Sequence, residues 1–339
     1  MTVPNARFTE LLQDIEPSST TKSHASTAHI KMREHLRTQS DFKDLYTGSF
    51  LSGSSARDTA LRPRTSAGQV ERPDIDIIVV TDFSTDDDPE WVLKKVCRAI
   101  EDKGIGYPVE RMNRRSVRVN TWRAEMDIVP VVEDGTEGYW IADRESGTWQ
   151  FTNPPVHKTW SAEQNAIFNG RFTPMVKLFK WWRRINPTSG KRPKGFVLER
   201  LVSLHAPVGE AHYGEAFTQL LENIQSAYEI NAALGMKPFI SDPAVPGNDI
   251  LSRVTVAQWQ EFIRKVATYA AIARKAQDAD DLDEATRQWR RVLGDRFKTT
   301  QKTKASASAF GTFATATPAP GYSFPDAMAA PTTKPRGFA

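Results

Sequence analysis

The chain has 339 residues, of which 39% are hydrophobic and 25% charged, a composition typical of a globular protein with about two domains. Its 45 lysines and arginines exceed its 41 aspartates and glutamates by four, and residues 299–339 hold four basic residues against one acid. The rest of the chain is therefore almost neutral. This argues against a protein that coats nucleic acid, because that role requires many phosphate contacts.

Cysteine content and the N-terminus favour a cytoplasmic protein with no membrane association. The single cysteine, Cys97, excludes an intrachain disulfide. The N-terminus lacks the apolar segment of a secretory signal, and the apolar run 75–80 is interrupted by Asp76 and too short to cross a bilayer. The six histidines have no H-E-x-x-H or C-x-x-C partner, so no zinc site is expected.

The first half of the chain mixes predicted helices with predicted strands. Apolar residues at helical spacing predict helices over 6–15 and 27–38, with a Ser/Thr-rich segment between them. The sequence DIDIIVVT predicts a buried strand over 74–81. Asp88-Pro89-Glu90 predicts the start of a helix that ends at Gly104. Two further strands are predicted over 116–120 and 124–132.

The chain becomes helical after about residue 160. Helical patterns cover 173–185, 196–205, 214–234, 255–276 and 283–293, and the last helix ends near Gly294. From Thr299 the chain is rich in Ala, Thr, Ser and Pro, which predicts a flexible tail. We therefore expect an α/β part with N-terminal helices over 1–160, a helical lobe over 161–298 and a tail over 299–339.

Three acids on two predicted strands form the strongest candidate site. Asp74 and Asp76 are two residues apart on one strand, so both point to the same face, and Asp127 lies in a second apolar strand. Such acids can be solvated strand residues or salt-bridge partners. They can also hold two divalent cations, and oxygen ligands favour Mg²⁺ or Mn²⁺ over Zn²⁺.

A Gly-Ser pair precedes these acids. Gly53-Ser54 begins the segment GSSARDTALRP, and Ser54 lies 20 residues before Asp74. A Gly-Ser turn that enters a helix offers backbone N–H groups and a hydroxyl to a phosphate. Gly48-Ser49 is a second such pair; we prefer Gly53-Ser54, and expect Ser49 to serve in packing or at a helix start.

The order of these motifs resembles that of the polymerase-β-like nucleotidyltransferases. A Gly-Ser pair is followed by D-x-D on a strand and by a third Asp on a later strand. The sequence is most similar to the bacterial cGAS/DncV-like nucleotidyltransferases, the CD-NTases, and within them to clade D. The similarity is carried by FLSGSSARDTALRP, RPDIDIIVVT, VKLFKWWRR, RPKGFVLERL, KPFISDPAVPGNDI and the terminal GFA.

This resemblance implies a fold and a reaction. The fold would be α+β, with a mixed sheet and helices as the catalytic core and a helical lobe like that of oligoadenylate synthase. The reaction would be attack of a ribose hydroxyl on the α-phosphate of a nucleoside triphosphate. Asp74, Asp76 and Asp127 would be the catalytic metal ligands for two Mg²⁺ ions, with Mn²⁺ as an alternative.

The resemblance also implies nucleotide-binding residues. Gly53 and Ser54 would hold the donor phosphates, and Lys180 matches a phosphate-contacting lysine of the family, with Lys177 on the same helical face. Phe196 matches an aromatic residue that stacks on a base in relatives. The remaining matches, in a loop near the pocket or on the acceptor side, are Asp242, Asn248, Thr59, Arg62 and Arg64. Solvated lysines, a core phenylalanine and turn residues are the structural alternatives.

The expected activity is synthesis of a cyclic di- or trinucleotide messenger from ATP and GTP in bacterial antiphage signalling, where the messenger activates an effector. Transfer to RNA or to a small molecule is the alternative within the enzyme class, and a catalytically idle binding subunit is the alternative outside it. The ending Gly337-Phe338-Ala339 resembles tails that ubiquitin-transfer-like enzymes join to targets, so Ala339 is a candidate priming site. An extension without a role is the alternative for the tail.

Overall fold

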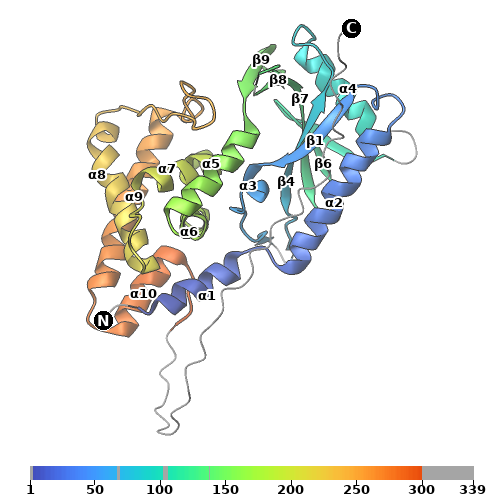
Figure 1. Ribbon diagram of the computed structural model, residues 1–339. Helices are drawn as coiled ribbons and strands as arrows, with labels where there is room; N and C mark the ends of the chain where they lie inside the picture. The colour runs from blue at the N-terminus through green and yellow to red at the C-terminus, as the bar shows by residue number, and fades with distance from the viewer. Residues whose placement is uncertain (1–2, 67–68, 102–105, 137, 300–339) are drawn as a thin grey trace, which may run out of the picture. The chain divides into compact units, whose positions relative to one another are not determined.

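The computed structural model describes residues 3–66, 69–101, 106–136 and 138–299, which belong to one compact unit (Figure 1). The predicted tail, its end at Ala339 and the predicted helix end at Gly104 lie outside the described residues. Among the described residues, no helix combines the length and apolar character needed to span a membrane.

A mixed sheet is the centre of the first part of the chain. Its strand order is β1-β4-β7-β6-β5, and β8 and β9 extend it from β7. Of the strand pairs in the described ranges, β4 and β7 alone are parallel, which brings their first residues to the same end of the sheet. The strands are β1 (Tyr46–Ser52), β4 (Asp74–Thr81), β5 (Val109–Met112), β6 (Val117–Asn120), β7 (Glu125–Glu133), β8 (Tyr139–Asp143) and β9 (Thr148–Thr152). The short strands β2 (Thr65–Ser66) and β3 (Gln69–Val70) form a separate pair.

Two helices cover one face of this sheet. Helices α2 (Ser19–Thr38) and α4 (Pro89–Glu101) share a hydrophobic core with Ile75, Ile77 and Val79 of β4 (Figure 1). Because side chains alternate along a strand, Asp74 and Asp76 point to the opposite face. On that face the described residues bury a small apolar cluster around Ile78 and Val80. The sheet therefore presents its acids away from the α2 and α4 layer.

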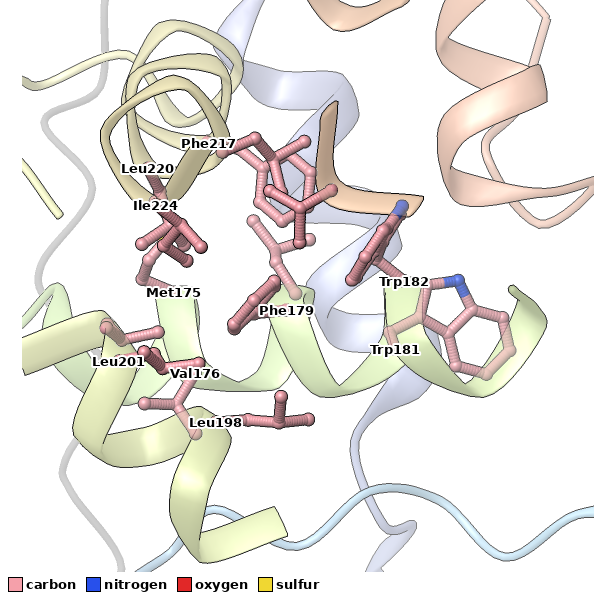
Figure 2. Close-up of a cluster of buried hydrophobic side chains, with 14 of the residues drawn as sticks. Met175, Val176, Phe179, Trp181, Trp182, Leu198, Leu201, Phe217, Leu220 and Ile224 are labelled. Atoms are coloured by element: carbon pink, nitrogen blue, oxygen red, sulfur yellow. The ribbon is translucent and has the colours of Figure 1, made fainter. Parts of the chain in front are cut away.

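The second part of the chain is a helical lobe with its own core. Phe179 and Trp182 of α6 stack at 5.3 Å between ring centroids, and apolar residues of α7 and α8 surround them (Figure 2). The helices are α5 (Pro154–Ile167), α6 (Phe172–Ile185), α7 (Gly195–His205), α8 (Tyr213–Ala233), α9 (Val256–Asp278) and α10 (Leu282–Leu293), with a 3₁₀ turn, η1, at Ser189–Lys191.

The predicted elements agree with the structure at most positions, with two corrections. Helix α2 begins at Ser19 rather than near 27, because Ser18 caps it by accepting a hydrogen bond from the Thr21 amide at 3.1 Å. Helix α1 (Asn5–Ile15) buries Phe8 and Leu11 in the core of the helical lobe, although the prediction placed the N-terminal helices with the sheet. Its apolar face packs on residues of the helical lobe, among them Phe217 and Trp289.

Candidate active site

The predicted acids lie side by side on neighbouring parallel strands. Asp76 of β4 pairs in register with Asp127 of β7, and Asp74 pairs with Glu125. All four carboxylates therefore share one face of the sheet. Glu125 is an acid that the sequence analysis did not single out. Burial and the nearby charges of Asp74 and Asp127 raise the pKa of Asp76 to about 7.

Arg118 of β6 lies against this acidic face. It pairs in register with Asp127, and its Nη2 lies 2.6 Å from Oδ2 of that residue. Its Nη1 lies 2.9 Å from Asp74 Oδ1 and 3.0 Å from Glu125 Oε2, while its Nε is buried and has no hydrogen-bond partner. One guanidinium group thus forms ion pairs with three of the four carboxylates.

Two further side chains fix the orientation of Asp127. Its Oδ1 accepts hydrogen bonds from the Asn113 amide at 3.0 Å and from the Ser116 hydroxyl at 2.8 Å. Both donors lie in the segment that connects β5 to β6. Asp127 is therefore held at both oxygens, and its rotamer is set before any ligand binds.

The Gly53-Ser54 turn lies directly against Asp76. It forms the single helical turn α3 (Gly53–Ala56), which follows β1. Gly53 has φ of +69°, and a Cβ placed there would lie 1.7 Å from Asp76 Oδ2. Only glycine fits at this position, because any side chain would displace the carboxylate. The Gly48-Ser49 pair lies within β1 instead, and Ser49 accepts a hydrogen bond from Arg33 at 2.7 Å.

A pocket of about 360 Å³ opens beside these residues. Gly53, Ser54 and Asp76 lie on its core side, and Lys180, Gly195 and Phe196 lie on its helical side. The remaining charged residues that line it are Arg57, Arg64, Arg183, Arg184 and Glu199. With five cationic side chains against two carboxylates, the pocket suits a polyanion that enters beside Asp76.

The floor of the pocket is a buried network that joins the two parts of the chain. Glu199 of α7 is fully buried and accepts hydrogen bonds from Arg57 Nε at 2.8 Å and Lys180 Nζ at 2.7 Å. The Thr59 hydroxyl donates to it at 2.9 Å. Burial opposes ionisation of Glu199, but Lys180 and Arg57 outweigh it and lower its pKa to about 2. Lys180 therefore lines the pocket while it is ion-paired.

Phe196 lines the pocket, and His157 connects it to the 242–248 loop. The ring of Phe196 packs edge-on against His157 at 4.6 Å, and Arg57 lies 5.0 Å from its centroid. His157 Nε2 lies 2.7 Å from Asp242 Oδ1, and the Asp242 amide donates to the Asn248 carbonyl at 2.9 Å. Asp242 and Asn248 thus hold the loop and support His157; neither lines the pocket.

The structure does not bring Lys177 to the pocket. Its side chain is buried in α6, and its Nζ lies 2.8 Å from Glu16 Oε1 and 3.4 Å from Asp58 Oδ2. Those partners tie α6 to the end of α1 and to the segment after α3. Cys97 also lies away from the site, half-buried in α4 beside the core of the sheet.

The acidic face has the donor set of a magnesium site. All of its donor atoms are carboxylate oxygens, and burial together with the like charges of Asp74 and Asp127, which a divalent cation would offset, raises the pKa of Asp76. In the described ranges no three acidic, histidine or cysteine side chains converge closely enough to hold a metal ion. Asp74 and Asp127 are paired instead with Arg118, so ion binding there requires these carboxylates to exchange partners.

Sequence reasoning missed the residues that act through distant partners. Arg118 carried one signal, since it stands between Val117 and Val119, which are fully buried in a short strand. Glu199 carried a weaker signal, a charge among the buried residues Val197, Leu198 and Leu201 of α7. A charged residue at either place requires a buried partner, but the sequence does not show which one.

This chain is similar to known proteins in sequence and in fold. Residues 1–165 match the model of the Second Messenger Oligonucleotide or Dinucleotide Synthetase domain. A cyclic AMP-AMP-AMP synthase of Acinetobacter sp. is 44% identical over 98% of this chain and 97% of its own length. A cyclic AMP-AMP-GMP synthase of Enterobacter hormaechei is 27% identical over 86% of this chain and 91% of its own length. The fold resembles that of the CD-NTase CdnG of Bradyrhizobium diazoefficiens, solved with GTP, at a TM-score of 0.68 and 19% identity over 86% of this chain and 95% of CdnG.

Proposed function

Because this chain belongs to the CD-NTase family of nucleotidyltransferases, we propose that it joins three ATP molecules into a cyclic trinucleotide messenger. The 44% identity with a cyclic AMP-AMP-AMP synthase over nearly the full length of both chains supports this product. The observation that carries the chemistry is the contact between Gly53 and Asp76 at the mouth of a basic pocket. It sets a phosphate-binding turn against the acidic face.

Each residue of the pocket has a role in the proposed transfer. Asp74, Asp76 and Asp127 would hold Mg²⁺, which when bound neutralises phosphate charge and lowers the pKa of the attacking ribose hydroxyl. Gly53 and Ser54 would bind the donor phosphates. Lys180 and the pocket arginines would stabilise charge that develops on the leaving pyrophosphate.

The bonds in this step balance without a further reactant. A bond forms between the ribose oxygen and the α-phosphorus, and the bond from that phosphorus to the bridging oxygen breaks. Pyrophosphate leaves with the electron pair, and the hydroxyl proton is released to solvent. Two such transfers give a linear trinucleotide, and a third closes the ring when the free hydroxyl end enters the pocket as acceptor.

Phe196 is the proposed contact for the adenine base. It is the aromatic side chain among the residues that line the pocket. Stacking of a base on an aromatic ring contributes about 1–3 kcal/mol. His157, Trp160 and Arg57 contact the ring, and these contacts restrict its orientation before the base arrives.

The product is identified by a direct assay. The pure protein is incubated with Mg²⁺ and ATP, with GTP or with both, then treated with phosphatase, and resistant products are identified by mass spectrometry. Cyclic tri-AMP from ATP alone supports the proposal. A mixed AMP-GMP ring corrects the substrate, and linear products or transfer to added RNA or an aminoglycoside would contradict cyclisation.

The biological setting is also part of the proposal. We propose that the messenger serves antiphage signalling in the cytoplasm and activates an effector protein. Priming by a ubiquitin-transfer-like enzyme would act at Ala339, which lies outside the described residues. Mass spectrometry of the protein from cells that carry its neighbouring genes tests this, and the absence of any adduct that depends on Ala339 would exclude it.

A further inference from the structure

A second cavity, of about 220 Å³, lies beside the catalytic pocket. We call it the arginine cavity. Four separate segments form it: the end of α1, the loop after α3, the end of α6 and the segment after α10. Its charged and aromatic lining residues are Asp14, Arg62, Arg64, Trp181, Arg184 and Arg296.

The arginine cavity has more positive charge than its own carboxylate can neutralise. Among the described residues that line it, Asp14 is the only acid, and it is already shared between Arg62 at 3.1 Å and Arg296 at 2.7 Å. Arg64 has no ion pair within the described part of the chain, and Arg184 donates to the backbone carbonyl of Arg62. Two of the four guanidinium groups therefore face the cavity without a carboxylate partner.

Partial burial makes the unpaired positive charge of the cavity more costly. Arg184 is half-buried, and desolvation together with Arg64 lowers its pKa to about 10, with Glu71 opposing the shift and Arg296 adding to it. Trp181 closes the cavity with its ring, which has Arg184 at 5.8 Å and Arg296 at 5.9 Å from its centroid. Clustered guanidinium groups repel one another, and a bound anion offsets that repulsion.

The arginine cavity adjoins the end of the catalytic pocket that is lined by arginines. Arg64 and Arg184 line both cavities, so these two side chains are available to an anion on either side. The volume is below the roughly 300–1,000 Å³ of pockets that hold drug-sized ligands. It therefore suits a small phosphate anion better than a whole nucleotide.

We propose that the arginine cavity binds the pyrophosphate released by nucleotidyl transfer, held by Arg64 and Arg184 and by the side chains of Arg62 and Arg296. This inference deepens the proposed function and rests on it for the identity of the anion. Transfer of pyrophosphate into this cavity clears the catalytic pocket for the next ATP. Pyrophosphate that accumulates in solution would occupy the same cavity and slow each later transfer.

Binding can be measured without catalysis. Asp76→Asn protein in EDTA is titrated with inorganic pyrophosphate, phosphate or ATP by isothermal calorimetry. Arg296→Gln is the informative variant, because Arg296 lines the arginine cavity and not the catalytic pocket. We expect it to weaken pyrophosphate binding roughly tenfold, the value of one lost charge-assisted hydrogen bond, and to change ATP binding less than about twofold.

Asp14→Asn separates charge from folding. It breaks the same ion pair as Arg296→Gln but removes the negative charge, so we expect pyrophosphate to bind more tightly. Arg264→Gln, an exposed position on α9, controls for net charge and should leave binding within about twofold. Weaker binding in both cavity variants, no change in either, or a loss confined to ATP would overturn the proposal. Because these titrations need no turnover, they stand even if the protein makes no cyclic product.

Discussion

Glu199→Gln should destabilise the protein more than any other single loss of charge in the pocket. The carboxylate is fully buried and binds two cationic side chains, whose own exposed fractions are 8% for Arg57 and 9% for Lys180. Glutamine keeps the shape and one acceptor oxygen. It loses the charge, and its amide group places a donor against donors of the network.

The magnitude follows from burial. Removing one partner of a buried ion pair leaves an uncompensated charge and costs about 3–5 kcal/mol. For a domain of this size each kcal/mol lowers Tm by about 2–4 °C. We therefore expect Tm to fall by roughly 10 °C. The control is Glu229→Gln, an exposed position on α8, which should change stability by less than about 0.5 kcal/mol.

The assay is thermal and denaturant unfolding followed by circular dichroism, with KM for ATP measured on the same samples. Lys180 loses the partner that fixes its position, so KM for ATP should rise together with the loss of stability. A free energy of unfolding for Glu199→Gln within about 1 kcal/mol of the wild-type value would contradict this prediction. It would mean that the network adds little to the attachment of α7 to the segment after α3.

Three further predictions concern the same site. Gly53→Ala should reduce the rate of synthesis roughly 100-fold by displacing Asp76, since a small misplacement of a catalytic group can cost a factor of that size. Gly48→Ala is the control and should leave the rate unchanged, because nothing lies within 4 Å of its added Cβ. Equal rates for the two variants would exclude the close contact between Gly53 and Asp76. Lys177→Gln should destabilise by about 1–3 kcal/mol with KM for ATP within twofold, and a tenfold rise in KM would return Lys177 to the nucleotide site. The pKa of Glu199 is lowered to about 2 in the folded state, from about 4.3 when unfolded, so its ionisation stabilises the fold above pH 4.3. In denaturant titrations, the difference in free energy of unfolding between wild type and Glu199→Gln should therefore shrink as pH falls toward 2. A difference that stays constant with pH would contradict this.

The acidic face could be predicted from the sequence because strand alternation is a local property. The apolar residues that flank Asp76 and Asp127 fix which way each carboxylate points, without reference to the rest of the fold. The family resemblance then placed Gly53 near them, and the structure shows why glycine is needed there.

The charged network could not be predicted, because its partners are distant in sequence. Glu199 is separated from Arg57 by 142 residues, and nothing in α7 alone indicates which cation it meets. Lys177 is the reverse case, a residue predicted for the nucleotide site that the structure places elsewhere. It lies three residues before Lys180, so both were placed on one helical face, but α6 turns Lys177 toward Glu16 and away from the pocket. Helix packing rather than spacing decided which lysine reaches the site.

The acidic face beside Gly53 is the part of the molecule that we expect to carry out cyclic oligonucleotide synthesis. The most direct measurement compares phosphatase-resistant cyclic products from wild type, from the double variant Asp74→Asn with Asp76→Asn, and from Asp82→Asn, an exposed acid just after the same strand. We predict cyclic tri-AMP from wild type and from Asp82→Asn, and none from the double variant at matched folding. Cyclic product from the double variant at the wild-type rate would contradict the claim.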